Sequence, residues 1–254
     1  MSRIRALYCD VDGTLTGPGG SLFASAEGPS ARAAEALLRL ARASVELVLV
    51  SGRTIEQLRE AARIVGARSF IAELGAYVVE RGTPDEVVPN LGAFRRSGTP
   101  FAAMARSGAG AFLMERYPRR LEPHAPWAFQ DRAATMVFRG GVDDAEATRR
   151  LEAAGYTWLE LRDNGRIPRR FDSLDVEDVH AYHLVPRGVS KASGVLLHRE
   201  RRGLERRETA AVGDSAADLE MAAETGAMAL VGDDAPEGVV TATTFADAVE
   251  RLLR

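Results

Sequence analysis

Residues 4–14 read IRALYCDVDGT, in which a mainly apolar run from Ile4 to Cys9 is followed by Asp10, Asp12 and Gly13. A short, nearly continuous apolar run predicts a strand that is buried on both faces, as in a parallel sheet covered by helices. Ligands of open parallel sheets bind at the carboxyl ends of the strands. We therefore expect the two carboxylates to lie in a binding crevice.

The same pattern of an apolar segment that ends in a polar turn recurs three times. The three segments are Val45–Val50 before Ser51-Gly52-Arg53, Glu208–Val212 before Gly213-Asp214-Ser215, and Ala227–Val231 before Gly232-Asp233-Asp234. Helical periodicity lies between these strands, with N-caps expected at Ser30, Thr54, Ser190 and Ser215. Strands that alternate with helices predict βαβ units, and therefore an α/β fold built on a Rossmann-like parallel sheet.

The middle of the chain departs from this alternation. Strands are expected at Thr135–Phe138, Thr157–Leu161 and Val179–Val185, a helix at Asp143–Ala154, and a tight hairpin at Asn164-Gly165. We therefore predict a second, smaller α/β domain at residues 84–185, inserted into a core formed by residues 1–83 and 186–254.

Composition excludes several classes of protein. The 254 residues carry a net charge of −3, which argues against nucleic-acid binding through an extended basic surface. The single cysteine, Cys9, excludes an intrachain disulfide and a multi-cysteine zinc site. No apolar run approaches the ~18 residues of a membrane span, and residues 1–5 lack a signal-peptide pattern. We expect a cytoplasmic protein with no nucleic-acid or membrane partner.

The Asp10-Val11-Asp12-Gly13 segment has a chemical and a plain interpretation. Two carboxylates at one strand end repel each other unless a cation or a proton relieves the repulsion, and Mg²⁺ with its oxygen ligands would do so. Gly13 permits close backbone approach, so its N–H can face an anion. The plain alternative is an Asp-Gly turn with solvated carboxylates, and this motif alone favours neither.

Two other strand ends carry candidate ligands. Asp214 and Asp218 add two carboxylates, although a turn residue and a first-turn acid would look the same. Ser51 and Gly52 precede a helix, where a hydroxyl and free N–H groups can hold a phosphate; an ordinary βα turn is the alternative.

Lys191 is the only lysine of the chain, and every other basic side chain except histidine is arginine. It follows Ser190 in the first turn of a predicted helix, where a cation opposes the helix dipole. Such a local conflict is typical of a functional residue, whereas a solvated surface lysine is the ordinary alternative. A compact ammonium group with three donors suits a site that a planar guanidinium would not.

The order of these segments resembles the four motifs of the haloacid dehalogenase (HAD) superfamily of phosphohydrolases, in its Cof-type and sucrose-phosphatase-like branch with a large α/β cap. The resemblance implies that Asp10 is the nucleophile and Asp12 the general acid and base. It implies that Mg²⁺ is held by Asp10, the backbone carbonyl of Asp12, Asp214 and, directly or through water, Asp218. Phosphoryl oxygens would be held by Gly13, Ser51, Gly52 and Lys191.

Two positions depart from the family pattern, and the predicted cap carries a group of arginines. Leu74 and Ala217 stand where many members have asparagine, which affects leaving-group recognition and metal affinity, respectively. In the predicted cap, a rim of arginines at the Asn164-Gly165 hairpin would bind a second anion, or would simply be a solvated tip. These are Arg162, Arg166, Arg169 and Arg170.

The sequence therefore predicts a Mg²⁺-dependent phosphatase that hydrolyses a small phosphorylated metabolite, a sugar phosphate or a phosphorylated acid, through an aspartyl-phosphate. A phosphotransferase or phosphomutase on the same scaffold is the enzymatic alternative, and a sugar-phosphate-binding protein without activity is the other. A serine esterase is excluded because no histidine follows His198 to serve Ser215 as a base. The Gly17–Gly20 run lacks dinucleotide-binding spacing. The sequence leaves the substrate and the oligomeric state open.

Overall fold

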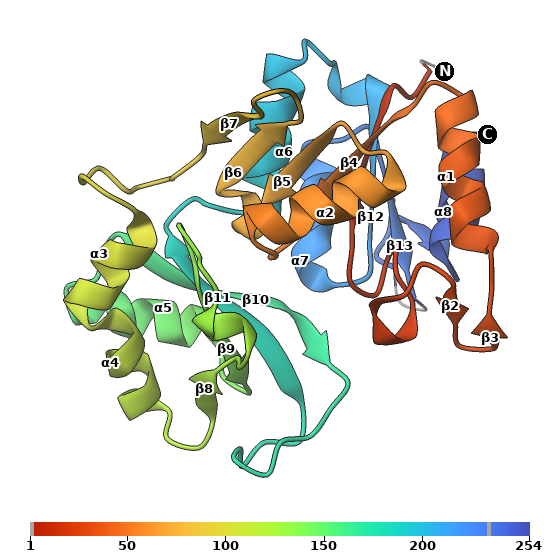
Figure 1. Ribbon diagram of the computed structural model, residues 1–254. Helices are drawn as coiled ribbons and strands as arrows, with labels where there is room; N and C mark the ends of the chain where they lie inside the picture. The colour runs from red at the N-terminus through yellow and green to blue at the C-terminus, as the bar shows by residue number, and fades with distance from the viewer. Residues whose placement is uncertain (1–2, 233–234) are drawn as a thin grey trace. The chain divides into compact units, whose positions relative to one another are not determined.

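The apolar run before Asp10 forms β1 (Ala6–Asp10), a central strand of an eight-stranded sheet in the computed structural model, which describes residues 3–232 and 235–254 (Figure 1). The strand order is β14-β13-β12-β1-β4-β5-β6-β7. Strands β14 to β5 in this order are parallel, and β6 and β7 are antiparallel additions at one edge. Their bounds are β4 (Glu46–Val50), β5 (Ser69–Ala72), β6 (Tyr77–Glu80), β7 (Glu86–Pro89), β12 (Thr209–Gly213), β13 (Ala227–Val231) and β14 (Val240–Ala242).

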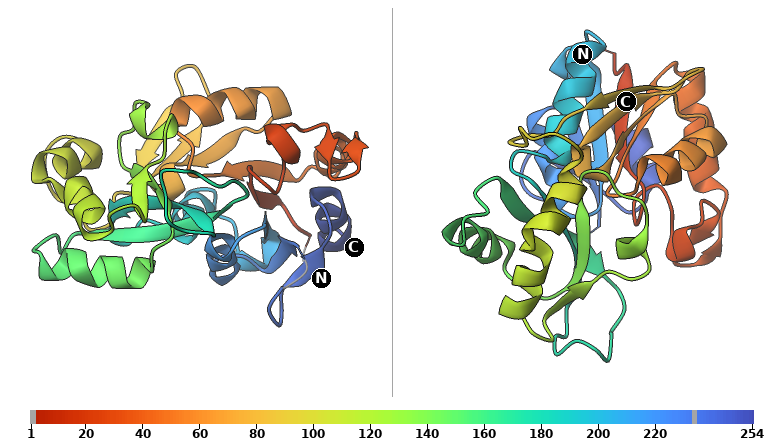
Figure 2. Two further views of the ribbon diagram at one scale, coloured as in Figure 1. Left: turned by 90° about the horizontal axis from the view of Figure 1, so that it is seen from below. Right: turned by 60° about the vertical axis from the view of Figure 1, so that its left-hand side comes forward.

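Alternate side chains of the sheet build two cores, one on each face. Leu7, Cys9 and Leu49 pack in one cluster with residues of α1 (Arg32–Arg42), α2 (Ile55–Val65) and α8 (Phe245–Leu252). Tyr8 and Val48 pack in the other with residues of α6 (Lys191–Arg201) and the 3-10 helix η5 (Glu220–Ala223), which follows α7 (Ala216–Leu219). Helices α1 and α8 lie side by side (Figures 1 and 2). This layered arrangement confirms the predicted α/β fold with a Rossmann-like sheet.

The predicted helix caps are mostly confirmed. Thr54 and Gln57 form a reciprocal capping box at the start of α2, and Gly66 ends that helix in the left-handed conformation at φ +75°. Ser190 caps α6 and Ser215 begins α7. The prediction for Ser30 is wrong by one position, because the N-cap of α1 is Ala31 and Ser30 only accepts the Arg32 N–H at 3.3 Å.

The chain divides into two units, one formed by Met1–Asn90 with Ser190–Arg254 and the other by Leu91–Val189. The insertion was expected at residues 84–185. The strand β7 pairs with β6 in the large sheet, so the residues up to Asn90 belong to the first unit. Two short strands, β2 (Ala24–Ser25) and β3 (Gly28–Pro29), form a separate hairpin in the first unit.

The second unit is a four-stranded antiparallel sheet with helices. The strand order is β10-β11-β9-β8. Its core combines side chains of the sheet with Met104 of α3 and residues such as Leu113 and Leu151 of α4 and α5. The bounds are α3 (Pro100–Ser107), α4 (Ala109–Arg116), β8 (Leu121–Pro123), η3 (Trp127–Phe129), β9 (Met136–Gly140), α5 (Asp144–Ala153), β10 (Leu159–Ile167) and β11 (Val179–Pro186).

The predicted Asn164-Gly165 hairpin is wrong. Both residues lie inside β10, which continues to Ile167 while its pairing with β11 shifts register between Asp163 and Arg166. Gly165 has φ +104°, a conformation that favours glycine, and it lies where the register shifts, so it accommodates a β-bulge and not a turn.

The remaining sequence predictions concern membrane contact and one strand end. Within residues 3–232 and 235–254, no helix combines the length and the apolar character that crossing a bilayer requires. Asp233 and Asp234, expected to follow β13, lie outside the described residues.

Candidate active site

Three neighbouring strands bring the predicted motifs to one edge of the sheet. Strand β1 pairs in parallel with β12 on one side and with β4 on the other, with Cys9 opposite both Val212 and Leu49. The residues that follow these strands therefore emerge together at their carboxyl ends. Asp10 is the last residue of β1, and Asp214 and Ser51 directly follow β12 and β4.

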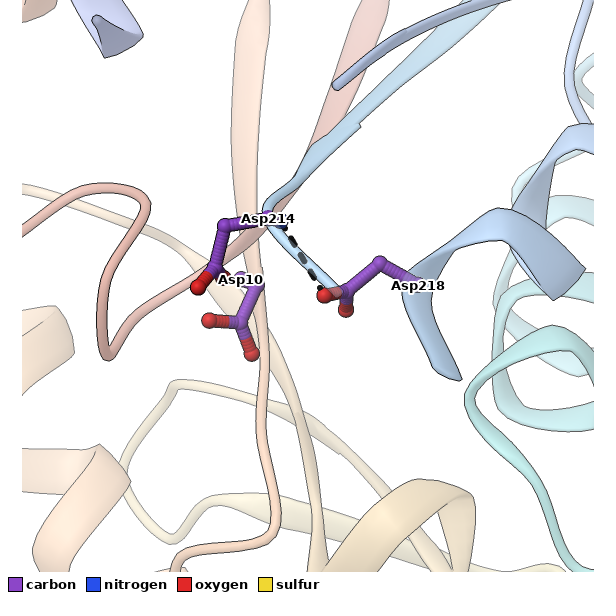
Figure 3. A group of neighbouring side chains, drawn as sticks. All are labelled: Asp10, Asp214 and Asp218. Atoms are coloured by element: carbon purple, nitrogen blue, oxygen red, sulfur yellow. Dashed lines mark hydrogen bonds between the residues drawn. The ribbon is translucent and has the colours of Figure 1, made fainter. Parts of the chain in front are cut away.

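Three carboxylates converge at this edge (Figure 3). One oxygen atom from each of Asp10, Asp214 and Asp218 lies within 4.8 Å of the other two. Asp10 and Asp218 are buried, and Asp214 is more exposed. Three carboxylates this close together repel one another unless a positive charge or a bound proton relieves the repulsion.

Lys191 supplies part of that charge. Its ammonium nitrogen lies 2.7 Å from Oδ1 of Asp10 and 2.7 Å from Oδ1 of Asp218. All three side chains are at most 7% exposed. The single lysine of the chain is therefore buried within the acidic cluster, which excludes the alternative of a solvated surface residue.

The electrostatics of the cluster follow from burial and proximity. Burial alone would lower the pKa of Lys191, but the carboxylates of Asp10 and Asp218 outweigh it and raise the pKa. Burial raises the pKa of Asp10, against the opposing effect of Lys191, and the Asp218 and Asp214 charges add to the rise. Loss of water around the Asp214 carboxyl group likewise raises the pKa of Asp214.

Asp218 is fixed by the start of α7. Its Oδ2 accepts hydrogen bonds from the backbone N–H of Asp214 at 3.2 Å and of Ser215 at 3.0 Å, and from Oγ of Ser215 at 2.6 Å. Its other oxygen remains for Lys191. The hydroxyl of Ser215 thus serves a helix cap, which agrees with the exclusion of a serine nucleophile.

Two glycines allow the backbone to approach these carboxylates. A Cβ atom on Gly13, whose φ is +88°, would lie 2.3 Å from Oδ2 of Asp214. A Cβ on Gly213 would lie 2.1 Å from Cβ of Asp218. Any larger residue would displace a carboxylate, so both positions require glycine.

The oxygen-only donor set fits a hard divalent cation such as Mg²⁺. Because Gly13 and Gly213 have no side chains, the carboxylates of Asp214 and Asp218 can lie directly against the backbone. Thr14 orients Asp214, since its Oγ1 donates a hydrogen bond to Oδ1 of Asp214 at 2.8 Å. The sequence analysis did not identify Thr14, although it directly follows the Asp10–Gly13 segment.

Asp12 lies apart from the trio of carboxylates. Its two oxygens accept hydrogen bonds from Arg53, at 2.8 Å from Nε to Oδ2 and at 2.5 Å from Nη2 to Oδ1. Arg53 stands beside Ser51 and Gly52 in the same strand-end segment, and its sequence pattern alone predicted no role for it. Its pairing with Asp12 raises the pKa of Arg53.

Ser51 is held by its neighbours. It is buried, its N–H donates to the carbonyl of Ile71 at 3.0 Å, and its Oγ accepts the N–H of Arg53 at 3.3 Å. The carbonyl of Ser51 accepts the N–H of Leu74 at 3.1 Å. Leu74 is one of the two positions at which the sequence departs from the family pattern. Its side chain is buried, its φ is +61°, and its backbone N–H makes this bond to Ser51.

A second hydrogen-bond cluster holds the N-terminus of α6, which carries Lys191. The side-chain amide of Asn90 donates to the carbonyl of Gly75 and to Oγ of Ser193, each at 2.9 Å. Ser193 and Ser190 form a reciprocal capping box. A Cβ on Gly75 would lie 1.9 Å from the carbonyl oxygen of Ser190, so this turn and the helix start are in close contact.

The arginines once expected at a hairpin tip are spread along β10 and the segment after it. Arg162 lies 3.2 Å from Glu160, and Arg166 lies 2.8 Å from Asp178. The guanidinium of Arg169 lies 5.1 Å from the ring centroid of Phe171. The tight turn is absent, and Arg169 and Arg170 lie instead in the longer connection between the antiparallel strands β10 and β11.

A family model of haloacid dehalogenase-like hydrolases matches residues 165–247. A phosphoglycolate phosphatase of Methanothrix thermoacetophila is 26% identical over 96% of this chain and 90% of its own length. A phosphoglycolate phosphatase of Metallosphaera sedula is 27% identical over 92% of this chain and 88% of its own.

Solved structures share the fold across the whole chain. A haloacid dehalogenase-like hydrolase from Bacteroides thetaiotaomicron superposes with a TM-score of 0.67 at 16% identity, covering 98% of this chain and all of that one. The sucrose-phosphatase of Synechocystis, solved with sucrose and phosphate, has a TM-score of 0.64 at 14% identity and covers 99% and 97% of the two chains. The family match over residues 165–247, the two relatives and the shared fold make this chain similar to the haloacid dehalogenase-like hydrolases.

Proposed function

We propose that this protein is a Mg²⁺-dependent phosphatase that acts on a small phosphorylated acid, of which 2-phosphoglycolate is the first candidate. Two relatives named phosphoglycolate phosphatase align with it over nearly their full length, at 26% and 27% identity. Within the range that the sequence left open, these relatives favour a phosphorylated acid over a sugar phosphate.

One observation carries the proposal: a single ammonium group lies 2.7 Å from each of two buried carboxylates, with a third carboxylate beside them. Hydrolysis of a phosphate monoester requires an anionic nucleophile to approach an anionic phosphoryl group. Positioning and charge neutralisation supply most of the acceleration of such reactions. The cluster combines the proposed nucleophile with a cation, and both side chains are buried.

In the proposed mechanism, a carboxylate oxygen of Asp10 attacks phosphorus. An O–P bond forms as the bond from phosphorus to the leaving oxygen breaks, and Asp12 gives its proton to that oxygen. Asp12 then takes a proton from a water molecule that attacks the aspartyl-phosphate. Inorganic phosphate leaves, and Asp10 returns to its carboxylate form.

The remaining residues of the cluster orient the phosphoryl group. Lys191, which contacts Asp10 directly, would bind a phosphoryl oxygen near the nucleophile. Backbone N–H groups at Gly13 and Gly52 and the hydroxyl of Ser51 would bind the others. Asp218 holds Lys191 in place, because its Oδ1 accepts from the ammonium while its Oδ2 accepts from the start of α7.

Asp10, the carbonyl of Asp12, and Asp214 would hold Mg²⁺, with Asp218 acting directly or through water. A bound Mg²⁺ neutralises charge on the phosphoryl oxygens and on the crowded carboxylates. The three carboxylates provide the oxygen donors that such an ion requires.

The test is a panel of phosphorylated metabolites assayed for phosphate release with Mg²⁺, with 2-phosphoglycolate, 3-phosphoglycerate and hexose phosphates as the main members. We expect release from 2-phosphoglycolate at the highest kcat/KM, none after chelation of the metal, and none with Asp10→Asn. Release from hexose phosphates alone would contradict the phosphorylated acid, and no release from any ester would contradict the phosphatase. Added alcohols that accept the phosphoryl group in place of water would instead favour a phosphotransferase.

A further inference from the structure

We propose that Arg53 is the positioning residue for the general acid and base of this site: its guanidinium group fixes the direction of the Asp12 carboxylate toward the leaving oxygen. The inference rests on the proposed phosphatase function. It adds a residue that the motif resemblance did not assign.

The geometry of the pair is that of a fork on a carboxylate. Nε of Arg53 lies 2.8 Å from Oδ2 of Asp12 and Nη2 lies 2.5 Å from Oδ1, so both oxygens are bound along one edge. A bidentate pair of this kind specifies orientation as well as proximity. A carboxylate has about four acceptor positions, so the opposite edge of Asp12 remains available.

Asp12 needs such a support because little else restrains its side chain. That side chain is 57% exposed, and it lies outside the trio of Asp10, Asp214 and Asp218. Within residues 3–232 and 235–254, the hydrogen bonds of its carboxylate all come from Arg53. Without the fork, the carboxylate would rotate freely about its side-chain bonds.

Arg53 is itself well anchored. Its N–H donates to Oγ of Ser51 at 3.3 Å, and its carbonyl accepts the N–H of Glu73 at 2.9 Å. The next residue, Thr54, begins α2 with a complete capping box. The backbone at Arg53 is thus fixed by a strand end on one side and a helix start on the other.

The position of Arg53 explains why a guanidinium serves here and an ammonium serves beside Asp10. Lys191 bonds two separate carboxylates as a compact charge, whereas Arg53 binds two oxygens of one carboxylate in a plane. The chain therefore uses its one lysine and this arginine for different tasks. One neutralises charge, and the other sets an orientation.

A series of ring-substituted phenyl phosphates tests the proposal, because its members differ in the basicity of the leaving oxygen and hardly in size. The leaving oxygen of 4-nitrophenyl phosphate needs little protonation, whereas that of phenyl phosphate needs much more. The quantity to measure is kcat/KM, which covers steps up to departure of the leaving group. In the wild-type protein we expect a shallow dependence on leaving-group basicity, because Asp12 donates the proton.

Arg53→Gln and Arg53→Lys should both lose activity selectively. A misplaced catalytic group lowers the rate about 100-fold. We therefore expect kcat/KM to fall by about that factor for phenyl phosphate, and by less than about threefold for 4-nitrophenyl phosphate. Arg53→Lys keeps the charge but not the fork, so it should resemble Arg53→Gln. In an Asp12→Asn background, Arg53→Gln should cause no further loss. Arg59→Gln is the matched control, since Arg59 lies in α2, which begins just after Arg53, and forms a partly exposed ion pair with Asp85.

Three results would overturn the inference. Equal losses for every leaving group would mean that Arg53 binds the phosphoryl group. An unchanged kcat/KM would mean that the ion pair is structural only. A gain in activity would mean that Arg53 holds Asp12 away from the reaction. If the wild-type protein released phosphate neither from these esters nor from 2-phosphoglycolate, the proposed function itself would fall, and the inference with it.

Discussion

Lys191 and Asp10 are 181 positions apart in the sequence, yet Nζ of Lys191 lies 2.7 Å from Oδ1 of Asp10. The contact joins the start of α6 to the end of β1, and both side chains are buried. The same Nζ atom of Lys191 also donates to Asp218, so Lys191 is the cation within a cluster of carboxylates. Both the stability and the chemistry of the site depend on this group.

Replacing Lys191 with methionine should destabilise the protein and abolish activity. Removing one partner of a buried ion pair leaves an uncompensated charge and costs roughly 3–5 kcal/mol. We expect that loss in urea titrations without metal, and a smaller loss with Mg²⁺, which would replace part of the positive charge. Arg199→Met on the same helix removes the partly exposed pair with Glu224 and should cost about 1 kcal/mol. Equal losses for the two variants would refute the assignment of Lys191.

Gly13→Ala should remove activity by displacing Asp214. The added Cβ would lie 2.3 Å from Oδ2 of Asp214, at a residue whose φ is +88°. Gly66→Ala is the matched control, because Gly66 has φ +75° and nothing lies within 4 Å of the added Cβ. Both variants should lose about 1 kcal/mol from backbone strain. A steady-state assay should show a loss of at least about 100-fold for Gly13→Ala alone; similar activity in both would contradict the close contact.

Asp214→Asn should raise the requirement for Mg²⁺ without destabilising the metal-free protein. The pKa of Asp214 is raised by loss of water around its carboxyl group, so its charged form is unfavourable in the folded state. We expect the Mg²⁺ concentration for half-maximal activity to rise by at least about 10-fold, and the melting temperature without metal to stay level or rise.

Asp85→Asn provides the opposite case for comparison. Arg59 lowers the pKa of Asp85, so the charged form of Asp85 stabilises the fold. The variant should melt at a lower temperature while its Mg²⁺ requirement stays unchanged. An unchanged Mg²⁺ requirement in Asp214→Asn would remove Asp214 from the proposed metal site.

His198 should make the protein less stable in acid. Its ring is fully buried beside Tyr8, with Nδ1 3.0 Å from the Tyr8 hydroxyl, and burial lowers the pKa of His198 to about 4. The unfolded chain has a histidine pKa of about 6.5. Between these values the unfolded state binds a proton that the folded state does not, so stability falls as the pH drops from about 6.5 to about 4.

His198→Gln removes this titration, and its free energy of unfolding should fall less over the same pH range. The difference between the two proteins at pH 4 should approach about 3 kcal/mol, measured by denaturant titration at each pH and referred to pH 7. Parallel pH dependences would contradict the burial of a neutral ring.

The sequence predicted the strand ends and the acidic cluster because these depend on local patterns. An apolar run before Asp10 or Asp214 reports a buried strand, and parallel pairing then brings those ends together. Lys191 was recognisable because a cation in a first helical turn contradicts the helix dipole.

Other features depend on information that local patterns do not contain. Gly165 signals a positive φ, but a tight turn and a β-bulge both need one, so the pattern does not tell whether the chain reverses. Helices α3 and α4 meet at Gly108, and their many small residues give weak amphipathic periodicity. The pairing of Arg53 with Asp12 joins side chains 41 positions apart and follows only from the assembled strand ends.

The decisive measurement is chemical trapping of the phosphorylated residue. The protein is mixed with substrate and Mg²⁺, quenched within one turnover, and reduced with borohydride, which converts an aspartyl-phosphate into homoserine. Peptide mass spectrometry should then find homoserine at position 10 in the wild-type protein and none in Asp10→Asn. Phosphate release with Asp10 unmodified at every quench time, or with the reduced residue at another position, would contradict the assignment of Asp10 as the nucleophile.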